Sequence, residues 1–342
     1  MVQKIELGLD SFGDVTADPD GQLLPQAQVI RNVVEEAALA EEVGVYVIGL
    51  GEHHRPDFAI SCPEVVLAAI ASRTKRIALA SSATVLSSDD PIRVFERFST
   101  LNAASSGRAE VILGRGSFTE SFPLFGYSLS DYEALFDEKL DLFATILKND
   151  AVTWQGHTRP PLTNQRIFPP IESGTFKTWI GVVGSPQCHS RGAYDLPAHA
   201  GDYRRRSQPF PALRRPLQSS VRAKWQAGPG DRRAFPRLCG RKRQYRTRGI
   251  MAGLQKDARS HRRRARLVPM TRAEFDSEIE RGSLYAGSRQ TVARRIATTV
   301  KSLGASRFHM KYSAGTLSHE KIMRCIELYG RKVIPMVQEM AA

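Results

Sequence analysis

The sequence contains few cysteines, and none of them has the short spacing of a paired metal or disulfide site. Four cysteines are spread over the 342 residues, at Cys62, Cys188, Cys239 and Cys325. This pattern argues against a zinc site or a disulfide framework and favours a reducing compartment. We therefore predict no metal centre and a cytoplasmic location.

The chain also lacks the hydrophobic segments that direct proteins into or across membranes. It has no run of about 18 apolar residues, so we predict no membrane span. Its first residues lack a basic stretch followed by an apolar one, so we expect no signal peptide. A GxGxxG motif does not follow the first apolar segment, which argues against a dinucleotide-binding Rossmann domain. No internal repeat of fixed period is present.

Acidic residues are scarce in one block of the chain, and this block carries all of the excess positive charge. The whole chain has 49 Lys and Arg against 35 Asp and Glu, a net charge of +14. Residues 198–269 hold 21 basic and 3 acidic residues, a net of +18, which leaves 28 and 32 elsewhere, a net of −4. The basic character is therefore local, and most of the chain is mildly acidic.

Outside this block, short apolar runs alternate with amphipathic segments. Such alternation indicates a parallel sheet covered by helices on both faces. Five strand–helix units, a gap and one further unit fit an α/β fold of the (β/α)8 TIM-barrel type, incomplete around strands 6 and 7, with residues 1–342 as one domain. The predicted strands are 4–12, 45–54, 76–86, 109–118, 178–185 and 306–313, and the predicted helices are 25–42, 63–74, 91–105, 131–148, 291–303 and one from about 319.

Functional residues of a parallel barrel follow the C-terminal ends of its strands. His53 and His54 follow the second predicted strand, and His53 is the candidate active-site residue. For either histidine the alternative is a structural role, bonded to a carboxylate. His54 is expected to point the other way, because neighbouring residues of a strand face opposite sides. Ser82 and Ala83 lie on the third strand, where small side chains let a planar ring approach the backbone. The alternative for these small residues is ordinary packing inside the barrel.

Two further strand ends have the character of an anion site. Arg115 lies between two glycines after the fourth strand, which suits a bidentate phosphate contact. An ion pair on a surface turn is the alternative for Arg115. Gly184 and Ser185 resemble a phosphate-binding turn at the start of a helix, although this short motif is common.

Together these segments resemble the bacterial luciferase-like flavin-dependent oxidoreductases. The resemblance covers about Ile5 to Gln187 and Met270 to the C-terminus, and the combination of motifs is more specific than any one of them. The matching segments are GLGEHHRPDFAISCPEVVLAA, SSATVLSSDDPIRVFE, SSGRAEVILGRGSFTESFPLFGY, WIGVVGSPQ, MTRAEFD and MKYSAGTLSHEKIMRCIELYG.

The resemblance implies a (β/α)8 barrel that binds reduced FMN or a deazaflavin coenzyme at the strand C-termini, and a homodimer. It implies that Arg115 and the turn with Gly184 and Ser185 hold the cofactor phosphate. It implies that Ser82 and Ala83 form a bulge behind the flavin ring, often with a non-prolyl cis peptide, and that His53 is the active-site histidine.

The resulting prediction is a monooxygenase that uses reduced FMN and O₂ on a small organic substrate, with a flavin reductase as a possible partner. A deazaflavin-dependent hydride transferase on the same barrel is the alternative enzyme. The alternative without catalysis is a protein that binds flavin, or binds nucleic acid through its basic block.

The basic block lies where the sixth and seventh strands of the barrel are expected. Residues 201–216 contain five arginines and three prolines without hydrophobic periodicity. Read from the second codon base, the segment permits an apolar strand, a Gly-Gly turn and an amphipathic helix. We therefore interpret residues 198–269 as encoded out of frame and irregular. A basic nucleic-acid-binding insertion and a plain flexible insertion are the alternatives, and nucleic acid is the less favoured partner.

Overall fold

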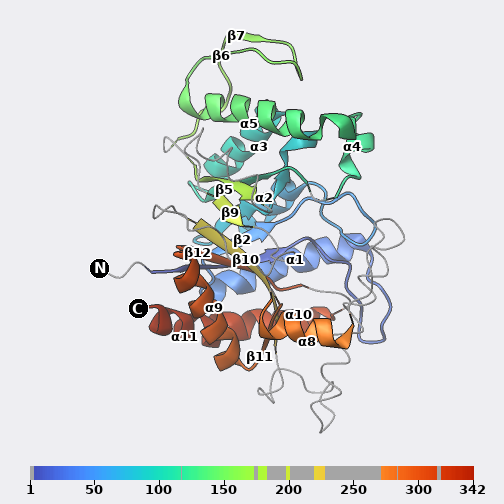
Figure 1. Ribbon diagram of the computed structural model, residues 1–342, viewed down its shortest axis with the longest axis vertical. Coiled ribbons are helices and arrows are strands. Elements are labelled where there is room, and N and C mark those ends of the chain that lie inside the picture. The colour runs from blue at the N-terminus through green and yellow to red at the C-terminus, as the bar shows by residue number, and fades with distance from the viewer. Residues whose placement is uncertain are drawn as a thin grey trace.

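The described part of the chain is a parallel β-sheet with helices packed around it (Figure 1). The computed structural model describes residues 4–116, 118–172, 176–182, 198–200, 219–227, 271–282, 284–313 and 317–342. In the part described, no helix has the length and apolar character needed to cross a membrane.

The N-terminal half alternates strands and helices, as the sequence pattern predicts. Its strands are β1 (Glu6–Ser11), β2 (Val47–Leu50), β3 (Ala78–Ser81), β4 (Thr84–Val85), β5 (Ala109–Gly114) and β8 (Thr178–Val182). Its helices are α1 (Gln26–Glu42), α2 (Pro63–Arg73), α3 (Pro91–Ala104), α4 (Ser121–Leu124) and α5 (Tyr132–Lys148). Short 3₁₀ helices occur at Leu86–Ser88 and Leu129–Asp131.

The C-terminal part resumes the same alternation. It contains α8 (Arg272–Glu280), β11 (Leu284–Gly287), α9 (Arg289–Leu303), β12 (Arg307–Lys311), α10 (His319–Leu328), a π-helical turn (Tyr329–Val333) and α11 (Ile334–Ala341). The sequence prediction missed α8, β11 and the antiparallel pair β6 (Val152–Trp154) and β7 (Leu162–Gln165). These strands have only three or four residues, too few to show a period.

Helix starts follow from local capping chemistry. The Asp90 side chain accepts hydrogen bonds from the backbone N–H groups of Ile92 and Arg93, and Pro91 occupies the first turn of α3. Ser288 caps α9 in the same way, and Gly304, with φ of 58°, ends that helix in the left-handed conformation. Each feature satisfies helix-end groups that would otherwise lack partners.

Six strands form a continuous parallel ladder in the order β12, β1, β2, β3, β5 and β8. Gly8 of β1 lies opposite His309 of β12 on one side and Val47 of β2 on the other. Chain-order neighbours that pair in parallel through intervening helices are the hallmark of a (β/α)8-type barrel. The fold class predicted from the sequence is confirmed over this arc.

The regular order breaks around the predicted sixth and seventh strands. β9 (Ala198–Ala200) pairs over three residues with β8 and with β10 (Ser219–Ala227). β10 lies between β11 and β12, which are consecutive in the chain. The regular order of a (β/α)8 barrel is therefore incomplete around strands 6 and 7, as predicted.

The prediction that residues 198–269 are irregular is wrong for two segments. β9 and β10 are strands, because exposed ladder edges of β8, β11 and β12 offer backbone partners to any extended chain. The remainder of the block lies outside the described residues.

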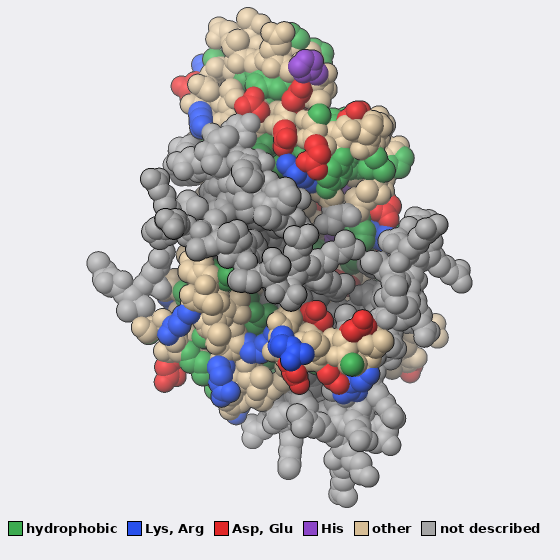
Figure 2. Space-filling view, in the orientation of Figure 1, with side chains coloured by type: hydrophobic (Ala, Val, Ile, Leu, Met, Phe, Trp, Pro, Cys, Tyr) green, Lys and Arg blue, Asp and Glu red, His purple; other side chains and the backbone are tan. Residues whose placement is uncertain are grey.

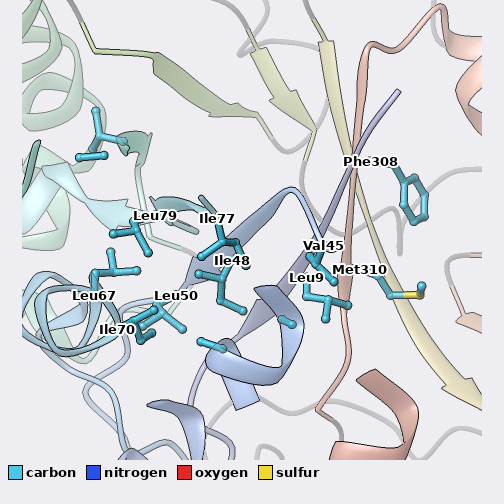
Figure 3. Packing of buried hydrophobic residues seen from close by; sticks show 14 of the residues in the cluster. Leu9, Val45, Ile48, Leu50, Leu67, Ile70, Ile77, Leu79, Phe308 and Met310 are labelled. Atoms are coloured by element: carbon cyan, nitrogen blue, oxygen red, sulfur yellow. The ribbon is translucent and has the colours of Figure 1, made fainter. Parts of the chain in front are cut away.

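The apolar core lies between the sheet and its helices (Figure 3). Leu67 and Ile70 of α2 face Ile48, Leu50 and Leu79 of the sheet, and all five are fully buried. Burial of such side chains contributes about 1.5–3 kcal/mol each. This packing holds the strand ends that carry the candidate site.

Candidate active site

His53 lies in an aromatic enclosure at the C-terminal end of β2. Its ring centroid is 4.4 Å from Phe12, 4.5 Å from Phe58 and 5.1 Å from Phe118. The His53 backbone N–H donates to the Ile60 carbonyl at 3.0 Å, which holds the loop in place. Phenyl rings around an imidazole exclude water and favour apolar groups beside it.

His54 has a different environment, as expected for the neighbouring residue. Its Nε2 lies 2.9 Å from Oε1 of the buried Glu52. This is the carboxylate-bonded structural arrangement that was the alternative for either histidine. The geometry therefore distinguishes His53, in the aromatic enclosure, from His54, which lies within hydrogen-bond distance of a carboxylate.

Glu52 connects the β2 loop to the end of β3. Its backbone N–H donates to the Ala83 carbonyl at 3.4 Å, and its carboxylate accepts from the Val85 N–H at 2.9 Å. The peptide bond between Ser82 and Ala83 is cis, as the family resemblance implied. Hydrogen bonds thus join the loop that bears His53 to the segment that contains Ser82 and Ala83.

Glycines flank this segment because its neighbours leave no room for a side chain. A Cβ at Gly51 would lie 2.9 Å from the Ser82 carbonyl oxygen. A Cβ at Gly114 would lie 3.1 Å from the Ala83 Cβ. The glycines therefore let the loop after β2 and the end of β5 pack closely against the Ser82–Ala83 segment.

Asp10, near the end of β1, is a buried carboxylate that the sequence analysis did not single out. Its Oδ2 accepts from the Ser82 hydroxyl at 2.7 Å, and its Oδ1 lies 2.8 Å from Nδ1 of His309. Both Asp10 and His309 are fully buried. A buried charge is tolerated only where such partners compensate its desolvation.

His309 belongs to a polar row on β12. Arg307, His309 and Lys311 alternate along the strand, are all buried, and each meets carboxylates. Lys311 Nζ lies 2.6 Å from Oδ1 of Asp14, and Arg307 pairs with Glu110. The alternation of Arg, His and Lys with apolar residues was the available sequence signal, because residues two apart share one face of the sheet.

Arg115 directly follows β5, where the sequence analysis placed it, and pairs with two acidic side chains of α5. It lies 2.6 Å from Glu133 and 2.9 Å from Asp137, with its guanidinium 4.6 Å from the centre of the Phe136 ring. This is the ion pair that was the alternative to an anion clamp. Glu133 and Asp137 are 67% and 57% exposed, so both carboxylates are free to turn into solvent.

The face above α5 is accordingly acidic. Figure 2 shows acidic side chains gathered over α5 beside hydrophobic ones over α4. Exposed Leu124 and Phe125 belong to this apolar surface. Gly184 and Ser185, the predicted phosphate turn, lie outside the described residues.

A buried lysine of α5 contacts the 3₁₀ helix that follows β4. Lys139 of α5 donates to the Ser87 carbonyl at 2.8 Å and lies 3.9 Å from the centre of the Tyr127 ring. Burial lowers the pKa of Lys139 to about 8, against the opposing attraction of Asp89 and Asp90. The amine thereby joins α5 to the loop that follows β4.

Solved structures of similar fold include two that differ in coenzyme. The oxygenating constituent of 3,6-diketocamphane monooxygenase from Pseudomonas putida, in complex with FMN, superposes with a TM-score of 0.70 at 16% identity, over 97% of this chain and 98% of that chain. An F420-dependent secondary alcohol dehydrogenase gives a TM-score of 0.68 at 14% identity, over 98% and 99%. At these identities the likeness concerns the fold.

Sequence comparison adds family evidence. The chain is 32% identical over 127 residues to the N-acetyl-S-alkylcysteine monooxygenase of Bacillus subtilis, which is 36% of this chain and 38% of that protein. The family model described as luciferase-like monooxygenase matches residues 12–196, which include His53, the Ser82–Ala83 segment and Arg115. This match spans more than half of the 342 residues. The chain therefore belongs to the luciferase-like monooxygenase family.

Proposed function

We propose that this chain is a flavin-dependent monooxygenase that binds reduced FMN and uses O₂ to oxidise a small organic substrate. Family membership supports the reaction class. The FMN complex of the camphane monooxygenase, which has the same fold, supports the choice of coenzyme. His53, the Ser82–Ala83 segment and Arg115 follow β2, β3 and β5, so they meet at one edge of the parallel sheet.

The observation that carries the proposal is the bonded unit of Glu52, Ala83 and Val85. It joins an aromatic enclosure around His53 to a backbone surface with small neighbours. A flavin ring needs a flat, apolar-backed surface on one side and a protected reaction space on the other. The Ser82–Ala83 segment, with its small neighbours, supports the first role, and the aromatic enclosure of His53 supports the second.

The phosphate end of the cofactor is assigned to Arg115 with Gly184 and Ser185. The structure offers one test of fit: Arg115 Nε is buried and has no hydrogen-bond partner among the described residues. A guanidinium with a donor to spare suits a phosphate oxygen. Ion pairs with exposed carboxylates are weak, typically about 0–1 kcal/mol, so a dianionic phosphate is able to displace Glu133 and Asp137.

Reduced FMN, when bound, supplies the electrons that activate O₂; the protein supplies orientation and a dry space. Phe12, Phe58 and Phe118 exclude water around His53. The imidazole of His53 holds or moves a proton at its ring nitrogen beside the reacting groups. Glu52 holds the loop that sets the position of this ring.

The experiment compares coenzymes directly. Purified chain is mixed anaerobically with reduced FMN or with a reduced deazaflavin, and the absorbance of the bound cofactor is recorded. Aerated buffer with candidate substrates is then added, and O₂ consumption is measured. Binding of FMN with O₂-dependent substrate oxidation supports the proposal. Binding of the deazaflavin alone, with no O₂ consumption, would replace it by the hydride transferase, which the fold of the F420-dependent dehydrogenase supports.

The proposal includes the expected partners. A reduced-FMN enzyme depends on a source of reduced flavin, so a flavin reductase is the expected protein partner. A homodimer and a cytoplasmic location complete the proposal. Size-exclusion chromatography and cell fractionation test these two points.

A further inference from the structure

We propose that Asp10 is a positioning residue for the flavin site, acting through the hydroxyl of Ser82. The inference rests on the proposed function, because it concerns the surface against which the flavin ring would pack. Asp10 itself is buried beneath that surface. It therefore acts through Ser82 and is not a catalytic residue.

The first step is the geometry of the carboxylate. Ser82 Oγ donates to Asp10 Oδ2 at 2.7 Å, and His309 Nδ1 lies 2.8 Å from Asp10 Oδ1. With Asp10 ionised, Nδ1 carries the proton and donates. The two oxygens of Asp10 are thus held by the segment after β3 and by β12, which fixes the plane of the carboxylate.

The second step is the close packing around Asp10. A Cβ at Gly49 would lie 2.2 Å from Asp10 Oδ1 and 2.9 Å from the Ser82 Cβ. Only a glycine leaves space for the carboxylate to reach Ser82 at this point. Glycine on β2, aspartate on β1 and serine after β3 therefore make one interlocked contact.

The third step is the contrast with the preceding serine. Ser81 is equally buried, but its hydroxyl bonds with the Ile112 backbone on β5, at 3.2 Å to the carbonyl and 3.1 Å from the N–H. Ser81 therefore stabilises the sheet, whereas Ser82 connects Asp10 to the segment that faces the site. The two serines provide a matched pair of substitutions.

The test is a double-mutant cycle with FMN as the probe. Ser82→Ala, Asp10→Asn and the double variant are prepared in the full chain, and FMN affinity is measured by flavin fluorescence quenching. Each single variant is expected to weaken FMN binding by about tenfold, the scale of one charge-assisted hydrogen bond. The double variant is expected to bind FMN about as tightly as the single variant with the lower FMN affinity, because both changes remove the same contact.

Ser81→Ala is the control. It should lower the midpoint of urea unfolding while leaving FMN affinity within about twofold, since it loses only contacts within the sheet. A purely structural role for Asp10 predicts the opposite pattern: lower unfolding midpoints for all variants and unchanged FMN affinity in the folded Ser82→Ala protein. That pattern, or single-variant effects that multiply in the double variant, would overturn the inference.

A variant that does not fold is distinguished from a variant that has lost the positioning role. If Asp10→Asn does not fold, the difference in FMN affinity between Ser82→Ala and Ser81→Ala still tests that role. The same variants are made in a second chain in which codons 198–269 are read one base along. If neither parent chain binds FMN, the proposed function itself is wrong; if a parent binds and Ser82→Ala binds equally well, only the positioning role is wrong.

Discussion

Asp10 and His309 face each other inside the barrel, with 2.8 Å between Asp10 Oδ1 and His309 Nδ1 and neither side chain exposed to solvent. They come from β1 and β12, at opposite ends of the chain but adjacent in the sheet. This contact therefore closes the N-terminal strand onto the last strand with a charge-assisted hydrogen bond.

Gly49 should be the residue least tolerant of enlargement near this pair. We expect Gly49→Ala to lower the free energy of unfolding by about 1–3 kcal/mol, because its methyl group would overlap Asp10 and Ser82. Urea denaturation measures the change. An unchanged denaturation midpoint would show that the Asp10 carboxylate has room to move.

Removing Arg115 should weaken cofactor binding. Arg115→Ala is expected to cost about 1.5–3 kcal/mol in FMN affinity, the scale of hydrogen bonds to a charged group. Asp137→Asn is the matched control on the other side of the ion pair, and it should tighten FMN binding by up to about 1 kcal/mol because a competing carboxylate is removed. Isothermal titration measures both, and changes of the same sign would contradict the assignment.

The two histidines should differ in their effect on catalysis. His53→Ala is expected to slow turnover by about 10²–10⁴ while FMN stays bound, because a positioned acid or base is lost. His54→Ala is expected to have a smaller effect, since His54 bonds to Glu52 outside the aromatic enclosure. Steady-state rates measure the effect of each variant on turnover, and FMN titrations measure its effect on cofactor binding. A large effect at His54 with none at His53 would exchange their roles.

Lys139 should make stability rise with pH. Its pKa falls from 10.5 to about 8 on folding, so the unfolded chain binds the additional proton between these values. Stability from this residue is therefore lowest below about pH 8 and increases towards pH 10.5. Urea unfolding of the natural chain and of Lys139→Met at pH 7, 8, 9 and 10 measures the difference. The free energy of unfolding of the natural chain should rise relative to that of Lys139→Met as pH rises. A difference that does not depend on pH would show that the pKa of Lys139 is not lowered on folding.

The gene should carry a latent second frame across residues 198–269. We expect the nucleotide sequence of codons 185 to 272 to encode, one base along, two apolar strands and their helices. The chain with the restored frame should be more soluble and bind FMN more tightly, because regular strands 6 and 7 would replace the short β9 and the inserted β10. A gene without such a reading would leave a plain or nucleic-acid-binding insertion, and salt-dependent DNA binding would distinguish these two.

Much of the fold was predictable because long, buried elements have a visible period. The helices 25–42 and 131–148 match α1 and α5 to within one residue, and the predicted strands contain β1, β2, β3 and β5. Short elements such as β6, β7 and β11 were missed because three or four residues carry no period. The place of β10 was also unpredictable, since it depends on which strand edges were open.

The candidate site divides in the same way. The positions of His53, Ser82, Ala83 and Arg115 at strand ends follow from the order of apolar and polar residues along the chain, because parallel strands present their C-termini at one edge. The structure then decided their environments: an aromatic enclosure for His53, a carboxylate for His54 and acidic neighbours for Arg115.

The sequence by itself determined the alternation of strands and helices and the residues at strand ends, because hydrophobic period and turn chemistry are local properties. Only the tertiary structure decided which buried charges meet. His309 lies 299 positions from Asp10, and Arg307 lies 197 positions from Glu110. Such contacts depend on strand order and register, and no local pattern encodes a partner so far along the chain.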